Sequence, residues 1–274
     1  KWEVIVVDNN STDNTSEEAR LIWKNFNNDI PFKILQESRL GLTYARRSGA
    51  KQAQYELLLF CDDDNWMAEN YFQLAFDMMQ QTPAIGILGG KGEAVFEKTK
   101  PVWFDTYQIN FAVGEQSDQE SEIVFVEAVY GAGIIVRAEL FELLNTLYFE
   151  SLLTGRKGNQ VISGEDTELC YVTKYVGYQI AYCRNLQFKH LMPDGRMNWN
   201  YMKRLYYGFG RMRVYTHAYK LLETTNRIPG QNLRLPLWLD KYLHLLKQLI
   251  YFLPQVILKL NEENLNSLIA PDLK

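Results

Sequence analysis

Acidic residues follow two short apolar segments of this chain, and their types and positions suit metal chemistry. Asp8 follows residues 2–7, and the triplet Asp62-Asp63-Asp64 follows residues 56–61. Three adjacent carboxylates repel one another, so they do not all stay ionised at low cost without a cation. Mg²⁺ or Mn²⁺ fits, because these ions are held by one or two carboxylates together with substrate phosphates. The alternative is a solvated acidic turn. An EF-hand calcium loop is not expected, because this segment lacks the glycine and the distal glutamate that such a loop requires.

The segments around these acids alternate between strand and helix patterns. The predicted strands, each short and apolar, are residues 2–7, 32–35, 56–61 and 85–88, the last stopped by Gly89-Gly90. One helix is predicted after Thr15, which with Glu18 has the spacing of a capping box, and others over 42–53 and 71–81. This alternation predicts an α/β fold with a mostly parallel central sheet. Ligands collect beyond the carboxyl ends of such strands, where both groups of acids lie.

The second half of the chain is less regular. Residues 91–122 are predicted to be loops, and residues 123–136 are strand-like but interrupted by Gly131-Ala132-Gly133. The later predicted elements are a helix over 138–147, a polar loop over 154–164, a helix over 166–175, and strands over 179–183 and 186–189. From Trp199 onward the pattern is helical.

Length and composition suit one large globular domain, alone or with an appendage. The chain has 274 residues, of which 47% are hydrophobic. Its three cysteines match no zinc or redox spacing, so a reducing compartment is expected. We find neither an apolar run of about 18 residues nor a signal peptide. Because the sequence starts at Lys1 directly in a strand-like run, we expect an N-terminal segment, and with it the first strand of the sheet, to be absent.

Five segments along the chain contain these acids together with glycine and arginine residues. They are WEVIVVDNNSTD at 2–13, GLTYARRSG at 41–49, FCDDDN at 60–65, Gly131-Ala132-Gly133 with Arg137, and Gly164-Glu165-Asp166. In this order and spacing they resemble the motifs of family 2 glycosyltransferases, and the third is similar to the DxD motif of the GT-A fold. The resemblance covers about residues 2–190. It implies a GT-A nucleotide-sugar-binding domain over 1–198 that transfers a glycosyl group with inversion.

The resemblance also implies roles on the donor side. Asp8 is expected to contact the nucleotide base, Asp62 the ribose and the metal shell, and Asp64 the metal itself. Arg46 matches a family arginine near the nucleotide. Arg47 departs from the asparagine that is frequent at its position, and its role there is therefore open.

On the acceptor side, an attacking hydroxyl needs a base placed across the sugar from the leaving group. Asp166 is the candidate because it begins a predicted helix after a glycine-containing loop; the alternative is a helix N-cap. Glu165 is expected to orient the acceptor, and Gly131-Ala132-Gly133 matches the family's acceptor-side segment beside the sugar nucleotide. His190, just after a predicted strand, matches a third metal ligand of several GT-A enzymes and favours Mn²⁺. A packed or solvated histidine is the alternative.

Charge is distributed unevenly along the chain. Residues 1–198 carry 18 Lys and Arg against 28 Asp and Glu, a balance of −10, whereas residues 199–274 carry 11 against 5, a balance of +6. The second part is expected to be a basic helical tail in which residues 238–260 present one apolar face. That face either packs on the catalytic domain or on a second copy of the chain, or it lies in a membrane interface. The acidic body argues against nucleic-acid binding.

We therefore predict a metal-dependent, inverting glycosyltransferase that uses Mn²⁺ or Mg²⁺ in cell-surface polysaccharide or glycolipid synthesis. Its predicted partners are a nucleoside diphosphate sugar and a carbohydrate or lipid-linked acceptor. Its predicted location is the cytoplasm, with peripheral attachment to the inner face of the membrane as an option. Two alternatives stay open: a sugar-phosphate nucleotidyltransferase on a related sheet, and a non-catalytic carbohydrate-binding relative.

Overall fold

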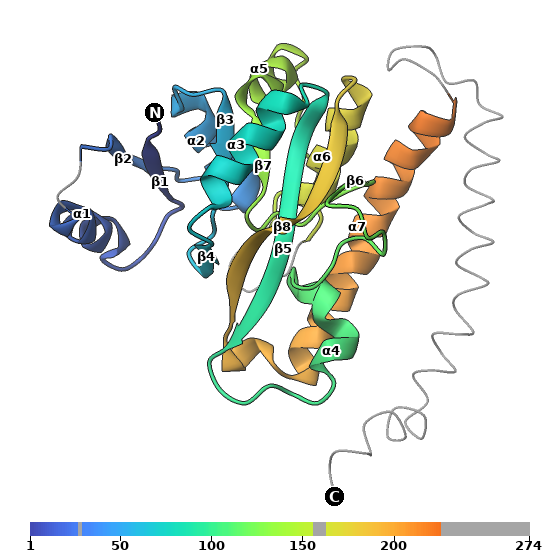
Figure 1. Ribbon diagram of the computed structural model, residues 1–274. Helices are drawn as coiled ribbons and strands as arrows, with labels where there is room; N and C mark the ends of the chain where they lie inside the picture. Colours follow the sequence, from blue (N-terminus) through green and yellow to red (C-terminus); the bar gives the residue numbers. More distant parts are fainter. Residues whose placement is uncertain (27–28, 156–162, 226–274) are drawn as a thin grey trace, which may run out of the picture. The chain divides into compact units, whose positions relative to one another are not determined.

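Two β-sheets form the framework of the computed structural model, which describes residues 1–26, 29–155 and 163–225 (Figure 1). The smaller sheet pairs β1 (Val4–Asp8) with β2 (Phe32–Gln36) in parallel, joined through helix α1 (Thr15–Asn25). The larger sheet has the order β3-β7-β5-β8-β4, and β6 pairs with β8. Its strands are β3 (Leu57–Leu59), β4 (Asn65–Met67), β5 (Ile85–Phe96), β6 (Ile123–Phe125), β7 (Ile135–Arg137) and β8 (Gln179–Met192).

Helices connect and cover these strands. They are α2 (Leu42–Gln52), α3 (Tyr71–Gln81), α4 (Phe104–Tyr107), α5 (Ala138–Thr146), α6 (Glu165–Tyr175) and α7 (Trp199–Thr225), with short 3₁₀ helices η1 (Gln108–Phe111) and η2 (Asp194–Arg196). The α/β architecture is therefore as predicted. Residues 91–122, predicted to be loops, in fact contain the end of β5, α4 and η1.

The larger sheet is mixed, which corrects the prediction of a mostly parallel one. β5 and β8 run parallel over a long register, but β7 is antiparallel to both β3 and β5, and β4 and β6 are antiparallel to β8. The interruption around Gly131-Ala132-Gly133 accounts for two of these antiparallel strands. It divides one apolar run into β6 and β7, and these two strands pair with different partners.

The predicted end of a strand at Gly89-Gly90 is wrong, because β5 continues to Phe96. A Cβ atom on Gly90 would lie 2.2 Å from the Leu186 carbonyl oxygen of β8. Glycine is thus needed there for the close approach of two strands, a use that a strand interior permits. The two strands predicted over 179–183 and 186–189 are also one strand, β8, which pairs with β5 on both sides of a register shift between Gly89 and Lys91.

The predicted capping box at Thr15 is also wrong. The helix begins at Thr15, so the N-cap is Asn14, and no side chain caps it. Asp13 instead accepts a hydrogen bond from the Thr15 backbone N–H at 3.1 Å. A local carboxylate has therefore taken the backbone donor that the box would have satisfied.

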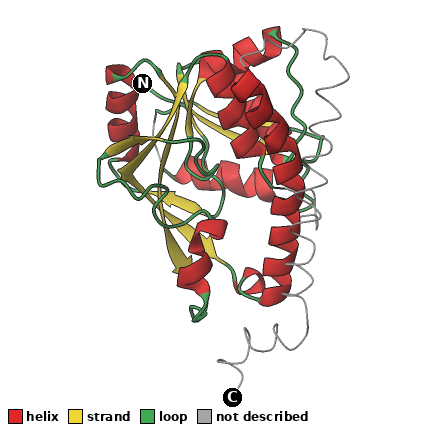
Figure 2. Ribbon diagram, turned by 90° about the vertical axis from the view of Figure 1, so that its right-hand side faces the viewer, coloured by secondary structure: helices red, strands yellow, loops and turns green. Residues whose placement is uncertain are grey.

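Helix α7 packs on the catalytic body. The compact unit extends over Lys1–Thr224, beyond the boundary at residue 198 that charge suggested. Its first turns place Tyr201, Met202 and Leu205 in a core cluster with Phe104 and Phe111. Figure 2 shows α7 as one continuous helix beside the sheet. The predicted amphipathic face at 238–260 lies outside the described residues.

Candidate active site

The acid triplet lies in the turn between β3 and β4. β4 pairs antiparallel with β8 in a register that sets Asn65 opposite His190, and the Leu191 N–H donates to the Asp64 carbonyl at 2.9 Å. This pairing brings the Asp64 carboxylate within 3.5 Å of His190 Nε2. Two of the three predicted metal ligands are thus neighbours, although they are far apart in the sequence.

Asp64 has a second partner that the sequence did not suggest. Arg196 Nη1, from η2, donates to Asp64 Oδ2 at 2.9 Å. Burial raises the pKa of Asp64, but the hydrogen bond and charge of His190 and the charge of Arg196 outweigh it and set the pKa at about 2. Asp64 is therefore ionised at neutral pH, while His190 Nδ1 is buried without a hydrogen-bond partner in the described part of the chain.

Arg46 connects the triplet to the rest of the site. Its side chain is buried in α2, with Nη2 3.9 Å from Asp62 Oδ1 and 3.1 Å from the Gly131 carbonyl oxygen that accepts its hydrogen bond. Burial raises the pKa of Asp62, and the Arg46 charge opposes that shift. Arg46 thus links the donor-side acid to the glycine segment.

The segment Gly131-Ala132-Gly133 lies between Arg46 and the start of α6. The Gly131 N–H donates to Asp166 Oδ2 at 2.9 Å. A Cβ atom on Gly131 would lie 2.8 Å from Arg46 Nη2 and 3.2 Å from Asp166 Cβ, so a side chain would separate these groups. Glycine at 131 therefore allows three elements to meet.

Helix α6 begins with the two predicted acceptor-side acids. Its N-cap is Gly164, with φ of 102°, so Asp166 is not the cap. Asp166 Oδ1 accepts a hydrogen bond from the Thr167 N–H at 2.6 Å, and both carboxylate oxygens are thereby fixed. Burial, and then the charge of Asp166, raise the pKa of Glu165 to about 7. Glu165 Oε2 is buried and has no partner among the described residues.

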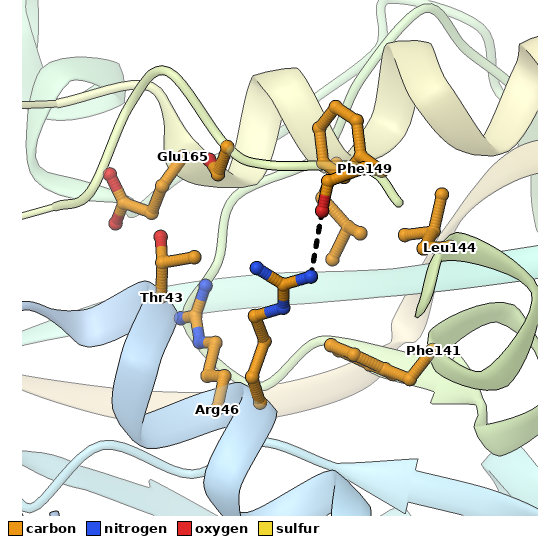
Figure 3. Close-up of a pocket in the computed structure, with 9 residues that line it drawn as sticks. Thr43, Arg46, Phe141, Leu144, Phe149 and Glu165 are labelled. Atoms are coloured by element: carbon orange, nitrogen blue, oxygen red, sulfur yellow. Dashed lines mark hydrogen bonds between the residues drawn. The ribbon is translucent and has the colours of Figure 1, made fainter. Parts of the chain in front are cut away.

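A pocket opens beside these groups. Figure 3 shows Glu165, Thr43 and Arg46 around its polar end, and Phe141, Leu144 and Phe149 around its apolar end. Arg47 contributes to the wall, because its Nη2 donates to the Phe149 carbonyl at 2.7 Å. The arginine that departs from the family pattern therefore anchors a loop that lines the pocket.

Asp8 stands apart from this group in its contacts. Its carboxylate accepts hydrogen bonds from the Ser16 hydroxyl at 2.6 Å, the Ser11 N–H at 2.9 Å and the Gln36 amide at 3.1 Å. These bonds hold the pKa of Asp8 well below its usual range. All three partners belong to the smaller sheet and its connections, so these bonds fix Asp8 within that sheet and do not join it to the triplet.

The sequence also did not indicate Asn9, the residue after Asp8. Its amide donates to the carbonyls of Glu37 and Arg39 at 2.8 and 2.7 Å, and its carbonyl accepts from the Gly41 N–H at 2.9 Å. Gly41 is the N-cap of α2, the helix that carries Arg46. Asn9 therefore fixes the start of that helix against β1. Its place in the WEVIVVDNNSTD segment was the only signal for it.

The donor set fits an open divalent-cation site. Among the residues that the structure describes, no group of three or more His, Cys, Asp or Glu side chains is arranged to hold a metal ion. The chain supplies Asp64 and His190 as a close pair with Asp62 nearby in the same turn, so a cation bound there would take its other ligands from the substrate. Diphosphate oxygens are such ligands.

The fold and this site define a class of proteins, the nucleotide-sugar-binding GT-A glycosyltransferases. Residues 1–138, half of the chain, match the family described as "Glycosyl transferase family 2". The chain therefore belongs to that family, which confirms the resemblance of its motifs and replaces the nucleotidyltransferase alternative.

Individual relatives agree with this assignment. The chain is 34% identical over 91 residues to "Poly-beta-1,6-N-acetyl-D-glucosamine synthase" of Staphylococcus aureus (strain COL), which is 33% of this chain and 21% of that protein. The match thus spans about a fifth of the length of this curated relative.

Two solved structures share the fold, each with a TM-score of 0.50. GalNAc-T7 with UDP, GalNAc and Mn²⁺ is 17% identical, over 69% of this chain and 38% of that one. The mannosyltransferase PcManGT from Pyrobaculum calidifontis with GDP-Man and Mn²⁺ is 19% identical, over 71% of this chain and 49% of that one. None of the helices in the described residues combines the length and the apolar character of a membrane-spanning segment.

Proposed function

We propose that this domain transfers a sugar from a nucleoside diphosphate sugar to an acceptor hydroxyl, with a divalent cation and with inversion. The observation that carries the proposal is the line of contacts from Asp62 through Arg46 and Gly131 to Asp166. It joins a cation-binding side to a base-bearing side across one small region, which is the layout that a direct displacement requires.

On the donor side, Asp64 and His190 would hold the cation, with Asp62 in its surroundings. When bound, the cation neutralises charge that develops on the diphosphate leaving group. Arg46 is held in place by its bond to the Gly131 carbonyl, and its remaining N–H groups can face a phosphate or ribose oxygen. Glycosyltransferases of the same fold that contain Mn²⁺ with UDP or GDP-Man support this assignment.

On the acceptor side, Asp166 removes the hydroxyl proton as the nucleophile attacks. Backbone N–H groups fix both of its oxygens, so the carboxylate does not need to reorganise during proton transfer. Glu165, with its pKa of about 7, is partly protonated at neutral pH and can donate a hydrogen bond that orients the acceptor. The raised pKa of Glu165 thus suits an orienting role that differs from the role of base proposed for Asp166.

We further propose that the acceptor belongs to a growing polysaccharide or a lipid-linked precursor at the inner face of the membrane. The relatives described as poly-N-acetylglucosamine synthases support the polysaccharide. The basic balance of residues 199–274 supports contact with an anionic surface, where a lipid-linked acceptor would be found.

The test is donor binding by the variant Asp64→Ala, compared with Asp63→Ala as a matched control from the same triplet. UDP- and GDP-sugars are screened with and without Mn²⁺ by thermal shift. A ligand that binds only the folded state raises its stability by about 2.7 kcal/mol at 100 times its dissociation constant.

We expect Asp64→Ala to lose the Mn²⁺-dependent shift and Asp63→Ala to keep it. An unchanged shift in Asp64→Ala contradicts the metal assignment. Binding of donor without any metal-stimulated donor hydrolysis in the unmodified chain indicates the non-catalytic relative instead.

A further inference from the structure

Arg196 places its positive charge next to the Asp64 carboxylate, where the proposed cation would bind. Its Nη1 lies 2.9 Å from Asp64 Oδ2, the same oxygen that lies 3.5 Å from His190 Nε2. The three side chains are mostly buried, with exposed fractions of 25% for Arg196, 16% for Asp64 and 11% for His190. A guanidinium therefore neutralises the carboxylate that the proposed function gives to the metal.

The two cations compete for this oxygen. A divalent ion bound to Asp64 and His190 would stand within a few ångströms of the guanidinium, and like charges at that distance in a partly buried site repel strongly. Without another anion, binding of the metal requires Arg196 to leave. Metal alone should therefore bind weakly.

The segment that carries Arg196 has room for this exchange. η2 lies between β8 and α7, and the surroundings of Gly195 contain no atom within 4 Å of where a Cβ would stand. The segment is held at its other end, where Asp194 pairs with Lys98 at 2.9 Å and its N–H donates to Glu97. The arginine side chain can therefore swing while its backbone stays anchored.

We propose that Arg196 binds the diphosphate of the donor and, in its absence, occupies Asp64 in place of the metal. This inference rests on the proposed function. When donor and metal arrive together, the guanidinium moves from the carboxylate to phosphate oxygens, for which its planar fork is well suited. The exchange couples the binding of metal and donor. The donor diphosphate draws Arg196 away from Asp64, which favours the metal, and the metal frees Arg196 for the diphosphate. The coupling therefore raises both affinities by the same factor.

The experiment measures two affinities in the full chain and in Arg196→Gln. Mn²⁺ binding without nucleotide is followed by electron paramagnetic resonance of the free ion. Binding of UDP, or of GDP if that binds the unmodified chain more tightly, is followed by calorimetry at saturating Mn²⁺. Lys98→Gln is the matched control, because it also removes one positive charge next to η2 but does not touch Asp64.

We expect Arg196→Gln to bind Mn²⁺ alone about tenfold more tightly and the nucleotide about tenfold more weakly, as loss of a charge-assisted hydrogen bond to phosphate predicts. Lys98→Gln should change neither affinity by more than about twofold. Arg196→Lys, which keeps the charge but loses the fork, should bind Mn²⁺ alone as the unmodified chain does and the nucleotide more weakly. Opposite changes in two affinities cannot come from a folding defect, which would weaken both.

An Mn²⁺ affinity that is unchanged or lower in Arg196→Gln overturns the inference and leaves the proposed function standing, provided that the unmodified chain binds Mn²⁺ and nucleotide together. If the unmodified chain binds neither nucleotide in the presence of Mn²⁺, the proposed function fails, and the inference fails with it.

Discussion

At the scale of single residues, both carboxylate oxygens of Asp166, the proposed base, are held by hydrogen bonds. Its two oxygens accept hydrogen bonds from the backbone N–H groups of Gly131 and Thr167, so its position depends on two elements, the loop that precedes β7 and helix α6. Neither bond involves the donor-side acids. The carboxylate can therefore be altered without disturbing Asp64 and His190, the proposed cation-binding pair.

We predict that Asp166→Asn keeps donor and Mn²⁺ binding but lowers turnover by about 10²-fold or more, as expected for loss of a general base. Single-turnover kinetics and calorimetry measure the two effects separately. A variant that loses donor binding and also melts well below the unmodified chain would show that Asp166 is structural.

The raised pKa of Glu165 predicts that the stability of the protein depends on pH. Its pKa rises from an ordinary 4.5 to about 7 because burial and the neighbouring Asp166 disfavour the charged form. A raised pKa means that the folded state holds this proton more tightly than the unfolded chain does. Its contribution to stability is therefore complete below about pH 4.5 and is lost as the pH rises through about 7.

Glu165→Gln removes this titration. We expect the variant to be more stable than the unmodified chain at pH 8, by about 2 kcal/mol, and the difference to shrink towards pH 5. Urea denaturation at the two pH values measures it. A stability difference that does not depend on pH would mean that Glu165 titrates normally in the folded protein.

At the scale of elements, α6 is fastened to its neighbours by one buried carboxylate. Glu168 is 1% exposed and accepts hydrogen bonds from the Leu152 and Leu153 N–H groups at 3.0 Å each and from the Tyr219 hydroxyl at 2.8 Å. The Ser151 hydroxyl donates to it as well. The helix that carries the proposed base is thus joined to a pocket loop and to α7.

We predict that Glu168→Gln lowers the free energy of unfolding by about 2–3 kcal/mol, because an amide cannot accept all four donors and leaves buried groups unpaired. Glu127→Gln is the control: its carboxylate pairs with Lys174 of the same helix at 2.8 Å but is 64% exposed, so the cost should stay below about 0.5 kcal/mol. Equal losses in the two variants would show that Glu168 does not fasten these elements.

At the scale of the whole molecule, the acidic body and the basic C-terminal part carry opposite charge, with balances of −10 for residues 1–198 and +6 for residues 199–274. Each Lys or Arg near an anionic surface contributes on the order of 1 kcal/mol, and salt screens that attraction. An apolar helical face adds a contribution that salt does not screen. Membrane contact therefore has a specific salt dependence.

We predict that binding to anionic vesicles falls, but does not vanish, as salt rises, and that deletion of residues 236–274 removes the remainder. Flotation with phosphatidylserine-containing vesicles measures both. Packing of this segment on the domain predicts no flotation at any salt, together with a lower melting temperature of the truncated chain. Absence of flotation at low salt would exclude the membrane proposal for this chain.

The sequence by itself determined the features that depend on local pattern. The apolar runs that end in acid located β1 and β3, and the helical spacing of apolar residues located α2 and α3 within a residue of their observed bounds. The order of the motifs indicated the family, which residues 1–138 confirm. These features are set by neighbouring residues, so they are visible in one sequence.

Only the tertiary structure decided how the site is completed. Asp64 meets His190 because β4 and β8 pair in one register, and it meets Arg196, 132 positions away, because η2 follows β8. Gly90 resembled part of a strand end until the position of Leu186 in β8 showed a close approach of two strands. Contacts of this kind depend on which strands pair and how closely they pack, and no local pattern of residue types specifies that.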